Sequence, residues 1–313
     1  MIRLAALVLG LVLAAPAQAQ DRLTVLLDWF VNPDHAPLIA AQELGYFAEE
    51  GLVVELVAPA DPNDPPKLVA AGRAEIAVSY QPQLHLQVHA GLPLVRFGTL
   101  VATPLNTLVV LANSPIASLA DLEGRRVGYS VGGFEDALLG AMLQSEGLGL
   151  DDIELVNVNF SLSPSLIAGQ VDAVIGAFRN FELNQMDIVG RPGRAFYPEE
   201  EGVPAYDELV YVTRPELTDD DRLARFLAAV ERATHWLVNH PDEGWALFAA
   251  YDDELDDELN RRAWDDTLPR LALAPAALDH GHYRGFAEFL ADAGLIDSPR
   301  PVADYALDLH AQP

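Results

Sequence analysis

Two segments of the chain repeat the same order of expected elements, and this repeat constrains the fold more than any other feature. Residues 71–78 (AGRAEIAV) align without a gap on residues 168–175 (AGQVDAVI). Hydrophobic periodicity and glycine stops predict strand, helix, strand, helix and strand in each segment. The predicted elements are residues 23–27, 35–50, 53–57, 66–71 and 75–78, and then residues 126–129, 134–146, 153–158, 164–168 and 172–175. The pattern predicts an α/β fold with two lobes of related design.

The alternation of strands and helices also predicts where a ligand would bind. It favours mainly parallel sheets, whose ligands lie beyond the carboxyl ends of the strands, so both lobes would face one shared cleft. We expect residues 219–313 to be mostly helical, with Thr218 as the first cap, and to pack on the first lobe. The chain would then cross between the lobes twice, near residues 106–110 and 206–210, as in a clam-shell with a hinge. The expected divisions are residues 20–107 for the first part of lobe 1, residues 108–207 for lobe 2 and residues 208–313 for the return to lobe 1.

The first 19 residues have the features of a cleaved signal peptide. Arg3 precedes an apolar run at residues 4–15, and Ala17-Gln18-Ala19 is the small-x-small pattern that signal peptidase cuts. No later stretch reaches the roughly 20 uninterrupted apolar residues of a transmembrane helix. The chain contains no cysteine, so we expect neither disulfides nor a lipid-bearing cysteine. These features predict an exported protein that is free in the periplasm.

The acidic balance of the chain argues against nucleic acid and anionic lipid as partners. Its 47 acidic and 19 basic residues give a formal net charge of −28, and such a surface repels polyanions. The acidic runs at residues 219–221 and 252–254 lack the glycine and the alternating oxygen ligands of a calcium loop. We interpret them as a helix first turn and a solvated surface.

Polar and aromatic residues follow two expected strands of the first lobe, where a ligand should lie. Trp29 stands among Asp28, Asn32 and His35 directly after the first strand. Its indole can stack on a flat heterocycle, an interaction worth roughly 0.5–1.5 kcal/mol beyond area burial. The sequence is equally compatible with a Trp29 that lies in the hydrophobic core. Tyr80 ends the third strand and could contact the other face of the ring. His35 could hydrogen-bond a ligand, although a histidine that opens a helix is more often a simple cap or a surface residue.

The second lobe offers a corresponding set. Gly132 and Gly133 precede Phe134 at an expected helix start, where free backbone N–H groups can receive a ligand oxygen. The same glycines also suit an ordinary tight turn. Asn180 and Glu182 follow the last strand of this lobe and could contact the amino edge of a ring, although a loop glutamate is usually exposed to solvent.

Six short segments together resemble one protein family. They are residues 27–37 (LDWFVNPDHAP), 45–47 (GYF), 79–82 (SYQP), 132–136 (GGFED), 179–182 (RNFE) and 202–209 (GVPAYDEL). These segments are similar to the ThiY-like binding proteins of ABC importers, which bind a formylated aminomethylpyrimidine, a thiamine precursor. The resemblance implies a type II periplasmic-binding fold, an ABC transporter permease as partner, and a ligand of the formylaminopyrimidine or hydroxymethylpyrimidine type. We also expect a monomer without a cofactor. Tyr206, in the last segment, joins the expected ligand site.

The same superfamily includes the fungal hydroxymethylpyrimidine phosphate synthase, a single-turnover enzyme that consumes its own histidine and a bound pyridoxal phosphate. Where that enzyme has a Schiff-base lysine and the consumed histidine, this chain has Ser79 and Gln83 by gapless comparison. A serine side chain cannot form an imine with an aldehyde. The residues therefore favour binding over synthesis, with no catalytic residue.

Two further patterns suggest other functions. Ser130 lies in a Gly-x-Ser-x-Gly sequence between an expected strand and helix, the arrangement of a hydrolase nucleophile. The chain has no glycine cluster upstream that would form an oxyanion hole, and His280 and His282 lie in the helical tail. His85 and His89 are four residues apart on an expected helix, a spacing that can bind zinc. A third zinc ligand is not evident, and we expect no metal.

The first prediction concerns processing. If residues 1–19 are a signal peptide, the exported protein begins at or near Gln20. Intact-mass analysis of the protein from a periplasmic extract measures this directly. An extract containing the protein with Met1 still in place would contradict the prediction.

Overall fold

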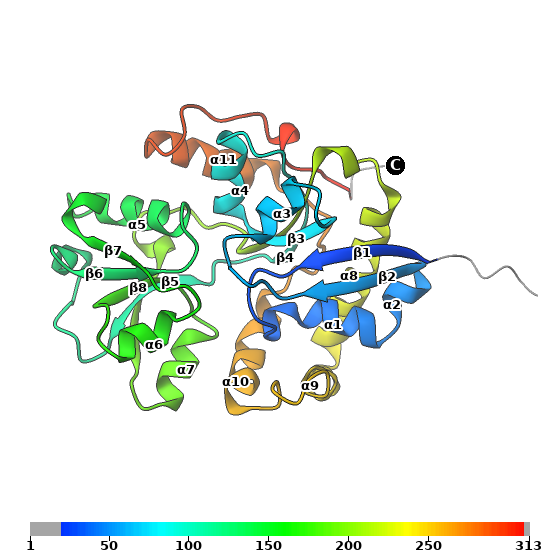
Figure 1. The fold of residues 1–313 in the computed structure, drawn as a ribbon, viewed down its shortest axis with the longest axis horizontal. Coiled ribbons are helices and arrows are strands. Elements are labelled where there is room, and N and C mark those ends of the chain that lie inside the picture. Colours follow the sequence, from blue (N-terminus) through cyan, green and yellow to red (C-terminus); the bar gives the residue numbers. More distant parts are fainter. Residues whose placement is uncertain (1–19, 310–313) are drawn as a thin grey trace, which may run out of the picture.

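Two five-stranded sheets form two lobes in the computed structural model, which describes residues 20–309 (Figure 1). The predicted signal peptide lies outside the described residues. The strand order is β2-β1-β3-β10-β4 in the first sheet and β7-β6-β8-β5-β9 in the second. The strands are β1 (Asp21–Leu26), β2 (Leu52–Val57), β3 (Ile76–Tyr80), β4 (Val95–Val101), β5 (Asn106–Leu111), β6 (Arg126–Tyr129), β7 (Glu154–Asn157), β8 (Ala173–Phe178), β9 (Gly193–Phe196) and β10 (Leu209–Thr213).

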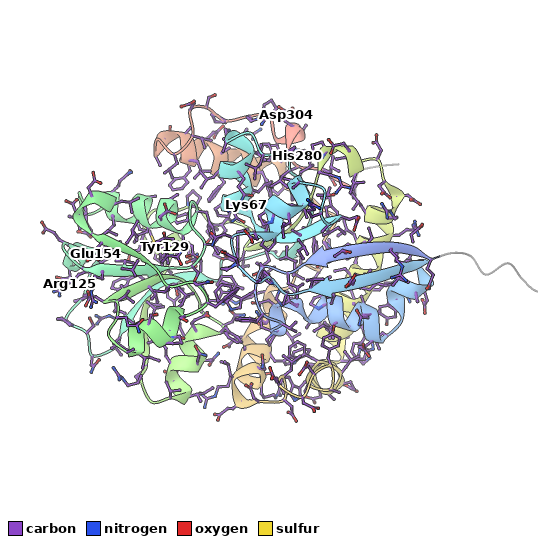
Figure 2. The ribbon with its side chains drawn as sticks, viewed as in Figure 1. Lys67, Arg125, Tyr129, Glu154, His280 and Asp304 are labelled. Atoms are coloured by element: carbon purple, nitrogen blue, oxygen red, sulfur yellow. The ribbon has the colours of Figure 1, made fainter. Side chains whose placement is uncertain are left out.

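The two sheets have the same plan, as the internal repeat predicts. In lobe 1, β1 pairs in parallel with β2 and β3, and β10 runs antiparallel between β3 and β4. In lobe 2, β6 pairs in parallel with β7 and β8, and β5 runs antiparallel between β8 and β9. Four strands of each sheet therefore point in one direction, and the fifth is the strand that enters from the other lobe. In Figure 2, Lys67 and His280 mark lobe 1, and Tyr129 and Glu154 mark β6 and β7 of lobe 2.

Helices cover the sheets, and one prediction about them is wrong. The single helix expected at residues 35–50 is divided, because Gly45 has the left-handed φ of 77° and ends the first piece. Among the described residues, no helix is both long and apolar enough to span a bilayer. The helices are α1 (Ala36–Glu43), α2 (Tyr46–Glu49), α3 (Pro65–Ala70), α4 (Gln81–His89), α5 (Glu135–Gln144), α6 (Leu162–Ile167), α7 (Glu182–Ile188), α8 (Asp221–Asn239), α9 (Pro241–Ala249), α10 (Glu258–Thr267) and α11 (His280–Asp292).

Helix α8 carries the chain back onto lobe 1. It packs against α1, α2 and β2, and its apolar face is buried. Its cap is Asp220, whose carboxylate accepts the backbone N–H of Arg222 at 3.0 Å. The expected cap was Thr218, but its hydroxyl donates to the carbonyl of Pro215 in the preceding turn. The helix therefore begins two residues later than the sequence pattern predicts.

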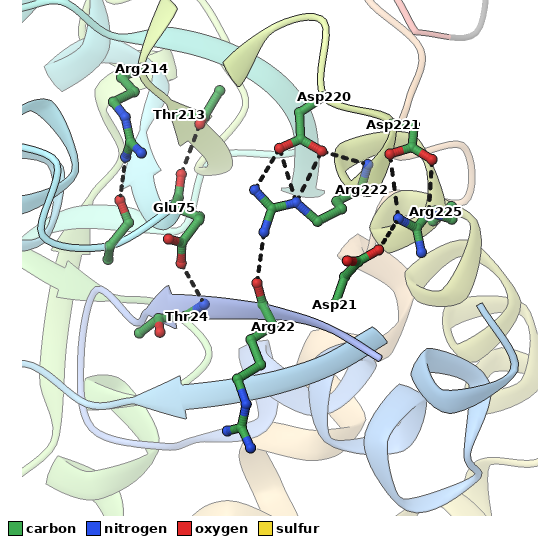
Figure 3. Close-up of polar contacts among 11 residues, drawn as sticks. Asp21, Arg22, Thr24, Glu75, Thr213, Arg214, Asp220, Asp221, Arg222 and Arg225 are labelled. Atoms are coloured by element: carbon green, nitrogen blue, oxygen red, sulfur yellow. Dashed lines mark hydrogen bonds and ion pairs between the residues drawn. The ribbon is translucent and has the colours of Figure 1, made fainter. Parts of the chain in front are cut away.

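Polar contacts tie the first described strand to α8, about 200 residues further along the chain (Figure 3). The guanidinium of Arg225 donates to the carboxylate of Asp21 at 2.7 Å. The guanidinium of Arg222 donates to the backbone carbonyl of Arg22 at 2.9 Å. These exposed contacts join the start of β1 to the returning helix, so α8 belongs to lobe 1.

The chain passes between the sheets twice, and the two crossings are bonded to each other. One lies between β4 and β5, and the other between β9 and β10. The carboxylate of Glu208, in the second crossing, accepts the backbone N–H groups of Leu105 and Asn106 in the first, at 2.6 and 2.9 Å. Burial raises the pKa of Glu208 to about 7. Arg179 donates to the carbonyl of Asn106 from the other side at 3.2 Å.

Candidate functional site

A narrow pocket lies between the lobes, at the carboxyl ends of β1, β3 and β8. Its lining atoms enclose about 360 Å³, part of it open to solvent, and the centre of a water molecule can reach about 20 Å³ of this space. The walls therefore lie close together, and the lobes are nearly closed. Lobe 1 contributes Asp28, Trp29, Asn32 and Tyr80, and lobe 2 contributes Glu135, Leu162, Gly176, Phe178, Phe181 and Glu182.

The lobe-1 wall is centred on the buried carboxylate of Asp28. One oxygen contacts Nε2 of His35 at 2.9 Å, and the other accepts the hydroxyl of Tyr80 at 3.1 Å. Nδ1 of His35 accepts the backbone N–H of Asn32 at 3.3 Å, so its Nε2 is the atom that donates to Asp28. His35 is fully buried and does not line the pocket. It orients the carboxylate of Asp28 from the side that faces away from the pocket.

Aromatic rings form two walls of the pocket. Tyr80 stacks on Phe134, with ring centroids 4.6 Å apart and an interplanar angle of 21°. Phe134 therefore supports the outer face of Tyr80 and does not line the pocket itself. Trp29 is half-buried and meets Phe160 of lobe 2 edge to face at 4.6 Å. The pocket is thus lined by an indole and a phenol ring, each held by a second ring.

Two buried carboxyl groups of lobe 2 face the same pocket, each on the first residue of a helix. Glu182 begins α7, and its carboxylate accepts the backbone N–H of Phe178 at 2.7 Å. Burial raises its pKa to about 7. Glu135 begins α5 and accepts the backbone N–H of Ser130 at 2.8 Å. Burial raises the pKa of Glu135 well above its usual range, although helix N-termini favour carboxylates.

Gly176 makes room for one of these carboxyl groups. Its φ is 97°, and a Cβ at this position would lie 2.4 Å from Oε1 of Glu135. Its N–H donates to the side-chain oxygen of Asn106 at 3.1 Å, beside the irregular pairing of β5 with β8. Sequence reasoning did not identify Glu135 or Gly176 as site residues. The expected strand ended at residue 175, whereas the observed strand β8 continues to Phe178 and contains Gly176; a glycine inside a strand often marks a close approach.

The glycine loop does not have the free N–H groups that we expected. The N–H of Gly132 donates to the side-chain oxygen of Asn63 at 2.9 Å. The N–H of Gly133 donates to the carboxylate of Asp136 at 2.5 Å. Neither glycine lines the pocket, and the first of these bonds joins lobe 2 to lobe 1. The loop contributes to the contact between the lobes.

Asn180 and Tyr206 also lie outside the pocket lining. The amide of Asn180 donates to the carboxylate of Asp34 and to the hydroxyl of Thr267, both at 2.8 Å, and so joins lobe 2 to lobe 1. The fully buried ring of Tyr206 packs on Phe286 at 5.5 Å. Of the expected ligand contacts, the structure brings Asp28, Trp29, Asn32, Tyr80 and Glu182 together around the pocket.

The two alternative sites have other partners. Ser130 is fully buried, and its hydroxyl donates to the backbone carbonyl of Asn159, so it is not presented to a substrate. His85 is buried among aromatic rings, and burial lowers its pKa to about 3. The ring nitrogens of His89 contact the carbonyls of His85 at 2.7 Å and Ser298 at 3.0 Å. Residues 20–309 contain no group of three or more side chains arranged to hold a metal ion.

Sequence comparison identifies related proteins. The family described as "NMT1/THI5 like" matches residues 32–244. A Haemophilus influenzae protein named for thiamine biosynthesis is 53% identical over 309 residues, which are 98% of each chain. The formylaminopyrimidine-binding protein of Halalkalibacterium halodurans is 35% identical over 82% of this chain and 78% of its own. The 4-amino-5-hydroxymethyl-2-methylpyrimidine phosphate synthase of Legionella pneumophila is 26% identical over 82% of this chain and 81% of its own.

Structural comparison confirms the expected fold. The alkanesulfonate-binding protein SsuA of Xanthomonas axonopodis pv. citri, bound to MOPS, has a TM-score of 0.71 at 16% identity, over 92% of this chain and 98% of its own. The periplasmic aliphatic sulphonate-binding protein SsuA of Escherichia coli has a TM-score of 0.67 at 16% identity, over 90% and 94%. At such identities the likeness shows the two-lobed periplasmic-binding fold alone.

The raised pKa of Glu182 predicts how stability depends on pH. Between pH 4.5 and about 7 the folded protein keeps a proton on Glu182 that the unfolded chain has released. The free energy of unfolding therefore falls as the pH rises through this window, by about 3 kcal/mol in total for this group. Glu182→Gln removes that contribution, so its melting temperature should fall less steeply between pH 4.5 and 7.

The exposed Asp187 on the same helix provides the control. Asp187→Asn should leave the pH slope of the wild-type protein unchanged. Thermal unfolding of the three proteins between pH 4.5 and 7 measures how steeply each melting temperature depends on pH. Identical slopes for wild type and Glu182→Gln would show that Glu182 titrates as an exposed carboxyl group.

Proposed function

The chain belongs to the NMT1/THI5-like family, and from this premise we propose that it binds an unphosphorylated pyrimidine precursor of thiamine for an ABC importer. The ligand would be of the formylaminopyrimidine or hydroxymethylpyrimidine type. The solute-binding role itself is supported by the formylaminopyrimidine-binding relative and by the binding proteins that share the fold. The chemistry of the pocket supports the finer assignment.

The observation that carries the proposal is the charge of the pocket wall. Asp28, Glu135 and Glu182 all line it, all three are buried, and none of the ten lining residues is basic. A buried carboxyl group needs hydrogen-bond donors or a positive charge to offset its desolvation. An aminopyrimidine supplies N–H donors and a ring nitrogen that can hold a proton. A phosphate group would add negative charge beside three acidic groups.

The aromatic walls match the shape of such a ligand. Trp29 and Tyr80 come from the ends of β1 and β3 and are held by other rings, so they present flat surfaces in fixed positions. Glu182 enters from the opposite lobe and can accept from an exocyclic amine. Its second oxygen can meet the neighbouring ring nitrogen when one of the two holds a proton.

The arrangement of the chain disfavours a synthase that binds pyridoxal phosphate. Lys67 is the only lysine in the sequence, and it is exposed on α3 and does not line the pocket (Figure 2). Ser79, at the position compared with the Schiff-base lysine, donates its hydroxyl to Gln83 at 2.8 Å. The pocket therefore offers no amine for an imine. We propose binding without a chemical step.

Hydrogen bonds across the cleft support a closing mechanism. Asn63 of lobe 1 bonds to Gly132 of lobe 2, and Asn180 of lobe 2 bonds to Asp34 of lobe 1. A ligand that touches both lobes stabilises this closed form over an open one. We propose that the closed, loaded form of an exported monomer is the form that reaches the permease.

Melting temperatures across a ligand series test the proposed function. Hydroxymethylpyrimidine and formylaminopyrimidine should raise the melting temperature, because ligand at 100 times its Kd adds about 2.7 kcal/mol to the free energy of unfolding. Hydroxymethylpyrimidine phosphate and zinc should give no shift. A shift from the phosphate equal to that from the alcohol would contradict the argument from pocket charge.

Calorimetric titration of Glu182 variants tests the contact with the ligand edge. Because ligand and Glu182 share one proton, affinity should fall as the pH rises above about 7, by up to tenfold per pH unit. Glu182→Gln should lose this pH dependence. Glu182→Ala should bind about tenfold to a hundredfold more weakly, because a ligand donor is left unpaired in the closed cleft. Equal affinities in all three proteins at every pH would remove Glu182 from the site.

A further inference from the structure

Three aromatic rings meet across the cleft at the outer side of the pocket. Phe160, in the lobe-2 loop between β7 and α6, lies 4.6 Å from the ring of Trp29 and 4.5 Å from the ring of Phe30. Trp29 lines the pocket, whereas Phe30 is 52% exposed. The cluster thus extends from the pocket wall to solvent. Both of these ring contacts join Phe160 to lobe 1, so they form only when the lobes come together.

The loop that carries Phe160 has an unusual backbone. Asn159 has a φ of 50° and is the only non-glycine residue between 20 and 309 with a positive φ. Left-handed backbone is unfavourable for residues with a Cβ, and such strain collects at functional positions. The N–H of Asn159 donates to the side-chain oxygen of Asn157 at 2.9 Å, and its carbonyl accepts the hydroxyl of Ser130. The side chains of Asn157 and Ser130 hold the loop in this shape.

The hydroxyl, the N–H and the carbonyl of Ser130 each form a hydrogen bond with a different part of the protein. Its hydroxyl holds the carbonyl of Asn159. Its N–H donates to the pocket carboxylate of Glu135 at 2.8 Å. Its carbonyl accepts the side-chain amide of Asn63, from lobe 1, at 3.2 Å. One buried residue thus joins the Phe160 loop, the pocket and the opposite lobe.

We propose that Phe160 is the gate residue of the ligand pocket, and that Ser130 is the positioning residue that sets it. On closure, Phe160 seats against Trp29 and Phe30 and covers the side of the pocket from which a ligand leaves. The proposal rests on the proposed function, since a gate acts on a bound ligand. It explains why a serine in a hydrolase-like sequence is buried and bonded to a carbonyl.

The contacts of Phe160 with Trp29 and Phe30 form in the closed protein, so their loss should change the rate of ligand dissociation. Stopped-flow measurements of tryptophan fluorescence with hydroxymethylpyrimidine give the association and dissociation rate constants. Phe160→Ala should raise the dissociation rate constant about tenfold, since two aromatic contacts are lost. The association rate constant should stay within about twofold, because most affinity differences between variants lie in dissociation. Phe160→Tyr should restore slow release, and an unchanged dissociation rate constant in Phe160→Ala would overturn the proposal.

A purely structural role for Phe160 has a different signature. It would lower the melting temperature of the ligand-free protein, whereas the gate role leaves that temperature unchanged. The matched control is Val189→Ala, which removes an apolar side chain of lobe 2 that is 55% exposed and lies at the end of α7. It should alter neither rate constant. If ligand-free Phe160→Ala melted at a clearly lower temperature than the ligand-free wild type, its faster release would reflect lost stability, and the proposal would be overturned.

Two substitutions at Asn159 test the positioning without touching either ring. Glycine adopts a φ of 50° readily, whereas valine is strained there. Asn159→Val should therefore release hydroxymethylpyrimidine about tenfold faster than Asn159→Gly, and Ser130→Ala should behave like Asn159→Val. Equal dissociation rate constants for the two Asn159 variants would overturn the positioning role.

A measurement without ligand separates this proposal from the proposed function. If the wild-type protein does not bind hydroxymethylpyrimidine, the proposed function fails, and the gate is then tested through closure alone. The chain has no cysteine, so cysteines introduced at the exposed Glu43 and Glu123 attach one fluorophore to each lobe. Phe160→Ala should lower the closed fraction seen by energy transfer at least about twofold. An unchanged closed fraction would overturn the gate.

Discussion

The carboxylate of Glu208 accepts two backbone N–H groups, those of Leu105 and Asn106, at the point where both chain crossings lie side by side. Each crossing strand lies inside the sheet of the lobe it enters, so this contact holds the two crossings together at the junction of the lobes. The carboxylate is fully buried, and its loss would leave two buried donors unpaired. Arg179 holds the same short segment from its carbonyl side. A hinge restrained in this way permits the lobes to swing while the crossings remain together.

The pocket makes selectivity and closure depend on the same groups. Asp28 of lobe 1 and Glu135 and Glu182 of lobe 2 line one pocket, and all three are buried. Each accepts a hydrogen bond from its own lobe, yet burial still raises the pKa of both glutamates, so their charged forms are not fully compensated. Under the proposed function, a ligand rich in N–H groups would supply further donors, whereas an anion would add negative charge beside these groups. The lobes therefore need not recognise the ligand by shape alone.

The sequence predicts well those site residues that follow strand ends. Trp29, Tyr80 and Glu182 line the pocket because the carboxyl ends of parallel strands meet at one edge. Residues whose places depend on distant segments could not be predicted. The N–H of Gly132 donates to Asn63, which lies 69 residues away in the sequence. The side-chain amide of Asn180 donates to Thr267, which lies 87 residues away. Placing Glu135 in the pocket would have required the backbone conformation at Gly176, which depends on the irregular pairing between β5 and β8.

Extending the gapless internal repeat by one residue gives Gly176 a counterpart in lobe 1. In that alignment Gly176 takes the place of Ser79, whose hydroxyl donates to Gln83 in lobe 1. Loss of one small side chain in lobe 2 leaves the space that a buried carboxyl group of α5 fills. Two lobes of one plan thus place their carboxyl groups differently: lobe 1 presents Asp28 from the end of its first strand, and lobe 2 presents Glu135 from a helix that faces Gly176. The two walls of the cleft are therefore not equivalent, although the sheets behind them have the same plan.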